Sequence, residues 1–491
     1  MSSIANPSGA PPKRSVLIFG DQPWSRDRIV QESIDAGLQV VLARLTSDHS
    51  EAILPKVHRE NGAGTEQRTA QHSEVLPDQV TRLSDEMLAR LRRQYGNDWC
   101  ALPMNDYVTE YAAAVSVHHS CYPARSAEIV KRKHELRNLW NELARQDEAN
   151  LYPVEYCYLE WRNDTARAEC HPGAGFDALP EQVAFVVKPD ELSSSIEIRR
   201  SHSKREAMSV AHDICVQLRS KWYDVGRAIG TEVRPRVIIE KAIERSQALH
   251  PGAEYSTEFV SLEGSHFSAG IVQKWTGPNF IETGHLYPAE SFPAGLVPAL
   301  ERAVQTLLRQ LGVMYGVSHW EFMVTQDNRI ALVEGHLRPA GDRIMELIGH
   351  STGKSPTAAL CQALASKATC FSFQRTVSTG IFWMVPKSPL EKVTSVSIDH
   401  SVTDGLCQDL YLNEEGIRQT ANWSRAEDWM TRFAHVIATG AGLAQIQDRC
   451  RRVAQGISLS GMNNGVPGTA RLMLAIDQSS TMPWCRAASA E

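Results

Sequence analysis

The chain lacks any apolar run of the roughly 18–20 residues that a membrane span requires, although 42% of its 491 residues are hydrophobic. Its first fourteen residues, MSSIANPSGAPPKR, lack the apolar core of a secretory signal. None of the ten cysteines forms a CxxC pair, so zinc-site spacing is absent. These absences predict a cytoplasmic globular protein with buried free thiols and no membrane partner.

An excess of basic residues is also lacking. Fifty-one Lys and Arg residues face 57 Asp and Glu residues, which gives a formal net charge of −6. This balance argues against a general nucleic-acid binder, so no nucleic-acid partner is expected. The length predicts two to four domains, each large enough for its own core.

A glycine-rich dinucleotide fingerprint is missing as well. A strand at 15–20, a helix at 26–36 and a strand at 39–45 form a βαβ opening, but the intervening turn, GDQPWS, is not GxGxxG. The unit is expected to continue with a loop at 58–80, a strand at 99–104 and a helix at 107–117. Residues 1–125 are therefore predicted to form a small α/β domain.

The most informative feature that is present lies in HWEFMVTQDNRIALVEGHLRPAGD, residues 319–342. Two apolar-rich runs, 320–325 and 329–334, are joined by a Gln-Asp-Asn turn and predict a β-hairpin. A hairpin would bring the carboxylates of Glu321 and Glu334 close together. Two-residue alternation places His336 on the same side as Glu334, with Arg338 following. Mg²⁺ and a polyphosphate would satisfy these four side chains together.

Lys133 and Arg137 lie four residues apart on a helix predicted at 128–146, and from spacing alone they are most simply a solvated basic face. Lys188 ends a strong strand at 183–188 and precedes a serine-rich loop at 193–195. A lysine followed by small residues can hold phosphate, although a surface hairpin with a solvated lysine explains the pattern equally well.

Two later strands carry polar side chains. The first is predicted at 235–243, and the second at 254–262 alternates Glu254, Ser256 and Glu258 onto one face. That face either belongs to a site or is the exposed side of a one-sided antiparallel sheet. Further strands are expected at 196–199, 266–275 and 279–285, and further helices at 296–311, 343–348 and 355–365. A separate small α+β unit is expected at 376–460, followed by a tail at 461–491 that is poorly ordered at its end.

Taken in order, these motifs resemble the ATP-grasp family over roughly residues 125–370. The resemblance implies an α/β protein with a Rossmann-like domain at 1–125, a two-lobed ATP-grasp clamp at 126–375 and the small C-terminal unit. It also implies ATP and Mg²⁺, or Mn²⁺, as cofactors. The residues it assigns to ATP are Lys133, Lys188, Ser194 and Ser195 at the phosphates, Glu240, Lys241 and Ile243 at the adenine, and Glu254 at the ribose.

In such enzymes Glu321 and Glu334 would bind the metal, and Arg338 would stabilise charge on the transferred phosphoryl group. Two departures from the family pattern stand out. His336 replaces an asparagine that is usually a metal ligand, so it either ligates the metal or contacts substrate or phosphate, since Mg²⁺ prefers oxygen. The phosphate loop is rich in serine where relatives have glycine.

Within the family, the chain is similar to L-amino-acid ligases and other carboxylate–amine ligases. The run 282–285 with Pro288, the His319/Glu321 pair and the run 338–342 carry this likeness. It implies condensation of a carboxylate, that of an amino acid, with an amine. The substrate-binding residues would be His285, Glu258 and Gly341, although His285 is equally explained as a structural histidine.

Other functions stay open on the sequence. An ATP-grasp enzyme with a carrier-protein thiol or a purine-type substrate as acceptor is one, and a nucleotide-binding regulator without catalysis is another. A biotin carboxylase is disfavoured by the length and by the absence of a lysine-centred biotinyl motif. A homodimer is common among the relatives, and the sequence does not decide the oligomeric state.

Overall fold

The computed structural model describes residues 15–19, 23–45, 72–76, 93, 99–115, 121–162, 167–173, 175–192, 195–219, 234–249, 254–277, 280–366, 371–388, 390–419, 432–463 and 465–479. Ser194, which the resemblance assigned to ATP, lies outside these residues. Within them, no helix has the length and apolar character needed to cross a membrane.

A four-stranded parallel sheet forms the N-terminal part, in the order β3-β2-β1-β4. Its strands are β1 (Ser15–Phe19), β2 (Gln39–Leu45), β3 (His72–Leu76) and β4 (Trp99–Pro103), and its helices are α1 (Pro23–Asp35), η1 (Asp106–Val108) and α4 (Thr109–Val115). The predicted loop at 58–80 is wrong at β3, which pairs with β2 despite its polar sequence. The edge strand β4 leads directly to Asp106.

The single helix predicted at 128–146 is wrong, because the chain forms two helices, α5 (Ala124–Lys131) and α6 (Lys133–Gln146). Arg132 between them is extended, with φ −90° and ψ 103°. The backbone N–H of Lys133 donates to the Asp190 carbonyl at 3.1 Å, and that of His134 donates to the Asp190 carboxylate at 2.9 Å. This distant acceptor holds the start of α6 and fixes the position of Lys133.

A five-stranded antiparallel sheet forms one lobe, in the order β6-β5-β9-β7-β8, with α7 (Lys204–Gln217) packed against it. Its strands are β5 (Tyr156–Arg162), β6 (Arg167–Pro172), β7 (Phe185–Pro189), β8 (Arg199–Ser201) and β9 (Arg236–Lys241), and η2 (Phe176–Ala178) lies before β7. The strand expected at 196–199 begins later, because Ser195 and Glu197 have positive φ angles of 56° and 55° and turn the chain.

The largest sheet has eleven strands, in the order β14-β13-β10-β11-β12-β15-β20-β19-β16, with β18 joined to β15 and β17 joined to β18. Its first part contains β10 (Glu254–Leu262), β11 (Ser265–Thr276), β12 (Glu282–Tyr287), β13 (Gly316–Val324) and β14 (Ile330–His336). The helices in this part of the chain are η4 (Gln247–Leu249), η6 (Ala294–Leu296), α9 (Val297–Gln310), α10 (Ile344–Thr352) and α11 (Pro356–Ser366).

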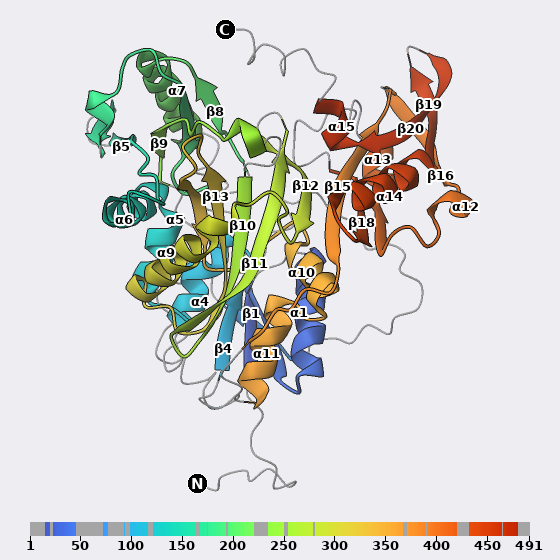
Figure 1. Cartoon of the computed structure of the whole chain (residues 1–491), viewed down its shortest axis with the longest axis horizontal. Helices are drawn as coiled ribbons and strands as arrows, with labels where there is room; N and C mark the ends of the chain where they lie inside the picture. The colour runs from blue at the N-terminus through green and yellow to red at the C-terminus, as the bar shows by residue number, and fades with distance from the viewer. Residues whose placement is uncertain are drawn as a thin grey trace, which may run out of the picture.

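The C-terminal elements extend the same sheet, because β12 pairs with β15. They are β15 (Ser378–Pro386), β16 (Lys392–Ile398), α12 (His400–Thr403), β17 (Asp409–Leu412), α13 (Glu414–Gln419), β18 (Ala434–Gly440), α14 (Leu443–Gln455), β19 (Ile457–Asn463), β20 (Val466–Leu474) and α15 (Ala475–Ser479). A tail starting at 461 is therefore wrong, since β19 and β20 form a hairpin around Gly465, whose φ is 76°. In Figure 1 the small sheet with α7 and the C-terminal elements lie on opposite sides of the central strands, at the left and the right of the view.

Candidate functional site

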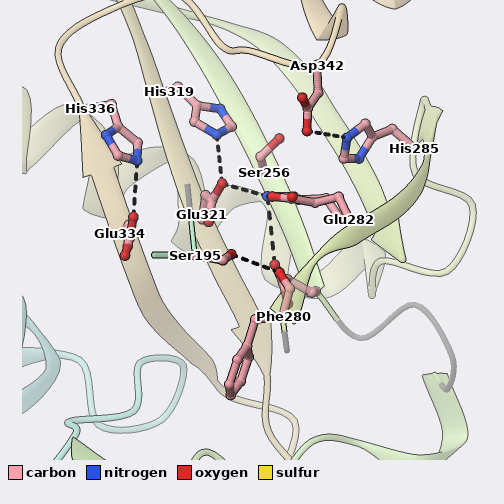
Figure 2. A network of polar contacts seen from close by, with 12 residues as sticks. Ser195, Ser256, Phe280, Glu282, His285, His319, Glu321, Glu334, His336 and Asp342 are labelled. Atoms are coloured by element: carbon pink, nitrogen blue, oxygen red, sulfur yellow. Dashed lines mark hydrogen bonds and ion pairs between the residues drawn. The ribbon is translucent and has the colours of Figure 1, made fainter. Parts of the chain in front are cut away.

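Polar side chains form two rows across β10, β13 and β14. The predicted hairpin is present, and Glu321 lies directly opposite Glu334. Ser256 on β10 extends this row, while Glu258, His319 and His336 form the second row. Residues directly opposite each other on neighbouring strands share one face of the sheet. The pairing therefore gathers five ionisable side chains from three strands on one face. Figure 2 shows Glu321, Glu334, His319 and His336 among them.

His319 links the two rows through both ring nitrogens. Its Nδ1 is 2.7 Å from Glu258 Oε1, and its Nε2 is 2.9 Å from Glu321 Oε1. Burial alone would lower the pKa of His319, but the two carboxylates raise it to about 9. His319 is therefore an imidazolium at neutral pH and donates from both nitrogens.

Lys274, which the sequence analysis did not single out, is the central cation of the site. It is 1% exposed, and its Nζ lies 2.5 Å from Glu321, 3.4 Å from Glu282 and 3.7 Å from Glu254. Burial alone would raise the pKa of Glu321, but Lys274 and His319 hold it well below its usual range. A lysine inside the apolar strand predicted at 266–275 was the signal available for it.

Glu254, predicted at the ribose, lies at the outer end of this group. Its carboxylate also lies 3.5 Å from Arg245. Burial raises its pKa even though two cations are near. Glu254 therefore contributes an acceptor to the rim of the site, and its contact with a ribose stays a prediction.

Glu334 faces cations from two elements. Its Oε1 is 3.5 Å from Lys133 Nζ at the start of α6, and its Oε2 is 3.4 Å from His336 Nε2. Burial alone would raise the pKa of Glu334, but Lys133, His336 and Lys188 lower it to about 2. Lys133 also donates to the Leu192 carbonyl. Glu334 is therefore ionised and held beside the lysine predicted to contact phosphate.

Arg137, Lys188 and Glu240 form a buried ion cluster behind Glu334. Arg137 Nε and Lys188 Nζ lie 2.8 and 2.9 Å from the two oxygens of Glu240. Arg137 also donates to the Leu332 carbonyl at 2.5 Å and is only 2% exposed. The solvated basic face expected at Arg137 is therefore wrong. Both oxygens of Glu240 already accept from cations, which weakens its predicted role at an adenine amino group.

The remaining residues assigned to ATP make contacts within the protein, and their contacts with ATP stay predictions. The Lys241 N–H donates to the Glu155 carbonyl at 2.9 Å, so this donor is taken by the protein itself. The Lys241 ammonium lies 3.2 Å from the Tyr152 hydroxyl. Half-buried Ile243 follows the end of β9. The Ser195 hydroxyl donates to the Phe280 carbonyl at 3.0 Å, which ties the serine-rich loop to the segment before β12 (Figure 2).

A cavity opens beside Glu334, between α5, α6, the end of β7 and β14. Apolar side chains such as Val130, Leu136 and Leu192 line part of it. Its ionisable lining residues are Asp106, Lys131, Lys133, Arg137, Glu191, Glu334 and His336. The cavity therefore gives the predicted phosphate lysine and one predicted metal ligand a shared opening.

Arg338 and His336 are both held by Asp106, which the sequence analysis missed. Asp106 Oδ1 lies 2.8 Å from His336 Nδ1, and Oδ2 lies 2.8 Å from Arg338. Burial alone would lower the pKa of His336, but Asp106 raises it. With Asp106 on one ring nitrogen and Glu334 on the other, His336 offers no lone pair to a metal, so metal ligation by His336 is disfavoured.

His285 lies on β12 beside Asp342, in the loop that follows β14. His285 Nε2 is 3.6 Å from Asp342 Oδ2, and among the described residues neither ring nitrogen has a hydrogen-bond partner. Asp342 receives a two-point contact from Arg432 at 2.9 and 3.1 Å. Gly341, just before it, is half-buried, and an added Cβ there would meet nothing within 4 Å. His285 and Gly341 are thus at one end of the polar face, with room beside them.

Replacing Asp342 by asparagine tests the Asp342–Arg432 contact through the pH dependence of the free energy of unfolding. Burial alone would raise the pKa of Asp342, but Arg432 and His285 lower it strongly. A carboxyl whose pKa is lowered by folding stabilises the protein fully at pH values above its unfolded-state pKa of about 4. This stabilisation is lost progressively as the pH falls below that value. We expect Asp342→Asn to reduce the free energy of unfolding by roughly 1.5–3 kcal/mol at pH 7, and by less at pH 3, in urea titrations.

The exposed Asp404 is the matched control for this change, since its side chain is 76% exposed and contacts only His400 among the described residues. Asp404→Asn should leave the unfolding free energy nearly unchanged at both pH values. An Asp342→Asn deficit that stayed constant between pH 7 and pH 3 would contradict the assigned ionisation.

A divalent cation fits the paired carboxylates. Mg²⁺ usually takes one or two carboxylates and completes its octahedron with water and phosphate oxygens. The contacts of Glu321 all fall on Oε1, and Glu334 lies directly opposite on the next strand. The described part of the chain contains no group of three or more His, Cys, Asp or Glu residues arranged around a metal. Two carboxylates with substrate phosphates are therefore the arrangement that this donor set suits.

Comparison with known proteins identifies the fold. Residues 181–346 match the family model of the ATP-grasp domain, a segment that runs from just before β7 into α10. The chain thus carries an ATP-grasp domain and has a mixed α/β fold. A search of curated protein sequences found no match.

Solved structures with the same fold cover nearly the whole chain. The L-amino acid ligase from Bacillus licheniformis matches with a TM-score of 0.65 and 13% identity over 92% of this chain and 100% of that one. The biotin carboxylase domain of Hydrogenobacter thermophilus 2-oxoglutarate carboxylase, in complex with MgADP, gives 0.60 and 11% over 94% and 92%. Phosphoribosylglycinamide synthetase from Anaerococcus prevotii gives 0.58 and 11% over 91% and 99%. At these identities the similarity establishes the fold.

Proposed function

We propose that this protein is an ATP-dependent carboxylate–amine ligase that forms an amide bond and releases ADP and phosphate. The observation that carries the proposal is the pair of polar rows on β10, β13 and β14, where Glu321 and Glu334 lie opposite each other among cations from three elements. The ATP-grasp domain and the fold shared with an L-amino acid ligase support it.

The reaction needs activation, because a free carboxylate is a poor acyl electrophile. Transfer of the terminal phosphoryl group of ATP to the carboxylate gives an acyl phosphate. An amine then attacks its carbonyl carbon, and phosphate leaves. Such chemistry depends mainly on positioning and on neutralising charge. A divalent ion, when bound, would neutralise negative charge on the phosphates.

The chain's own groups would supply the rest. Glu321 and Glu334 would hold the ion through their oxygens. Lys133, beside Glu334, would contact a phosphate, and Lys188 would contribute positive charge from the Glu240 cluster. Arg338 would stabilise the charge that develops during transfer.

Two unsatisfied buried atoms support an amino acid as the activated substrate. Glu258 Oε2 and Arg338 Nε are both buried and have no hydrogen-bond partner among the described residues. Glu258 is also one of the charges that raise the pKa of Arg338, so the two groups are near each other. A carboxylate acceptor and a guanidinium donor within electrostatic range of each other suit the ammonium and carboxylate of a zwitterion. His285 would face the same substrate.

A matrix of amino acids and amines, assayed for phosphate release with Mg²⁺·ATP and for condensed products by mass spectrometry, tests this function. Phosphate release that requires both substrates, together with a condensed product, is the expected result. Turnover only with a thiol or a purine-type acceptor would show that the protein catalyses a different ATP-grasp reaction. Nucleotide binding without turnover for any pair would favour a regulator. Its cytoplasmic location and a homodimer stay predictions, and size-exclusion chromatography tests the latter.

A further inference from the structure

Asp106 connects the N-terminal sheet to the proposed site. It begins η1, three residues after β4, and its side chain is only 14% exposed. It lies outside the segment that matches the ATP-grasp domain. Even so, each of its carboxylate oxygens contacts a different side chain of the run 336–338: Oδ1 is 2.8 Å from His336, and Oδ2 is 2.8 Å from Arg338.

Arg338 is held by a small set of contacts. One terminal nitrogen donates to Asp106, and the other donates to the Pro339 carbonyl at 3.0 Å. The buried Nε has no partner among the residues described. A flexible guanidinium fixed at both terminal nitrogens loses less freedom when it meets developing charge, and such preorganisation accelerates reactions. Asp106 therefore helps to decide where Nε and the other unused N–H groups of Arg338 point.

We infer that Asp106 is a positioning residue that orients Arg338 toward the reacting phosphoryl group and fixes the His336 ring against Glu334. This inference rests on the proposed ligase function. The N-terminal unit would then complete the catalytic arrangement, in addition to packing against the domain that carries it. Asp106 itself need not touch the substrate.

Simple charge compensation is the competing explanation. Two buried cations need a nearby anion whatever their function, and an acid anywhere within reach would provide it. Charge compensation depends little on the position of the carboxylate, whereas positioning depends on it closely. Asp106→Glu separates the two, because it keeps the charge and moves the carboxylate by one methylene.

The test measures kcat and KM for ATP, with unfolding by urea and binding of a fluorescent ATP analogue as readouts independent of turnover. We expect Asp106→Asn and Asp106→Glu to lower kcat by about 10- to 100-fold. We expect KM and analogue affinity to stay within about threefold of wild type. Asp106→Glu should unfold at nearly the wild-type urea concentration. Glu110→Gln is the matched control, since Glu110 belongs to the next helix and pairs with Lys131 at 3.4 Å.

A double-mutant cycle with Arg338→Ala decides whether Asp106 acts through Arg338. In that background Asp106→Asn should change kcat by less than about threefold. Full kcat in Asp106→Glu, or losses that multiply in the double variant, would overturn the inference while leaving the ligase function intact. If the wild-type chain itself shows no turnover with any substrate pair, the proposed function and this inference fall together.

Discussion

Glu334→Gln is expected to lower kcat by roughly a thousandfold, because a neutral amide cannot replace a carboxylate that holds a divalent ion on the phosphates. The pKa of Glu334 is lowered to about 2, so its charge is present throughout the neutral range. Glutamine keeps the size of the side chain and can still accept from Lys133. Steady-state ADP release at saturating substrates measures the effect.

Two further observations make this result specific. Affinity for a fluorescent ATP analogue without added metal should change by less than about tenfold, because lysines and backbone also hold the nucleotide. Glu414→Gln is the control, since Glu414 on α13 forms an exposed pair with Arg418 and its side chain is 48% exposed. A wild-type rate for Glu334→Gln would show that Glu334 does not hold the metal.

Lys274→Met is expected to produce the largest loss of stability. Lys274 is the buried ammonium shared by Glu254, Glu282 and Glu321. Methionine has a similar length and no charge, so the variant would leave three carboxylates without this partner. Removing one member of a buried ion pair typically costs about 3–5 kcal/mol. Urea titration at pH 7 in the presence of EDTA measures the deficit.

Magnesium should reverse part of that deficit. A cation that binds only the folded state stabilises it in proportion to its occupancy, and Glu321 without Lys274 is a stronger site for one. We expect added MgCl₂ to raise the unfolding free energy of Lys274→Met more than that of the wild type. Lys387→Met, at an exposed position before β16, is the control. Equal stability of Lys274→Met and wild type would show that Lys274 does not balance the carboxylates.

The polar face could be predicted because strands repeat every two residues. The strand expected at 254–262 is β10, and the hairpin expected from the run 319–342 is β13 and β14. Alternation placed Glu254, Ser256 and Glu258 on one side of their strand, and Glu334 and His336 on one side of theirs. The turn between β13 and β14 then set Glu321 opposite Glu334. Each of these inferences used residues close together in the sequence.

The errors arose where a distant partner decided the local structure. The helix predicted at 128–146 breaks at Arg132 because the Asp190 backbone and side chain accept from the start of α6. Arg137 looked like a solvated residue because its carboxylate partner, Glu240, lies 103 residues away. The residues around Gly465 were assigned to a tail, yet they form the turn of a hairpin whose strands pair along their length.

The two site residues that the sequence analysis missed, Lys274 and Asp106, were missed for the same reason. Lys274 is a single lysine in an apolar strand, and Asp106 is a single acid after an edge strand of another sheet. Neither has a neighbour in sequence that marks it. Only the pairing of β10 with β11 and the packing of η1 against β14 bring them to Glu321 and Arg338.

The sequence by itself determined which strands carry the acidic and basic side chains and which face each one occupies, because backbone alternation and turns act over a few residues. The tertiary structure alone decided which charges meet, since strand order and helix docking choose the partner of a carboxylate, as they do for Glu240 and Arg137, 103 residues apart. Burial then set the strength of those contacts, as water no longer screens a lysine that is 1% exposed.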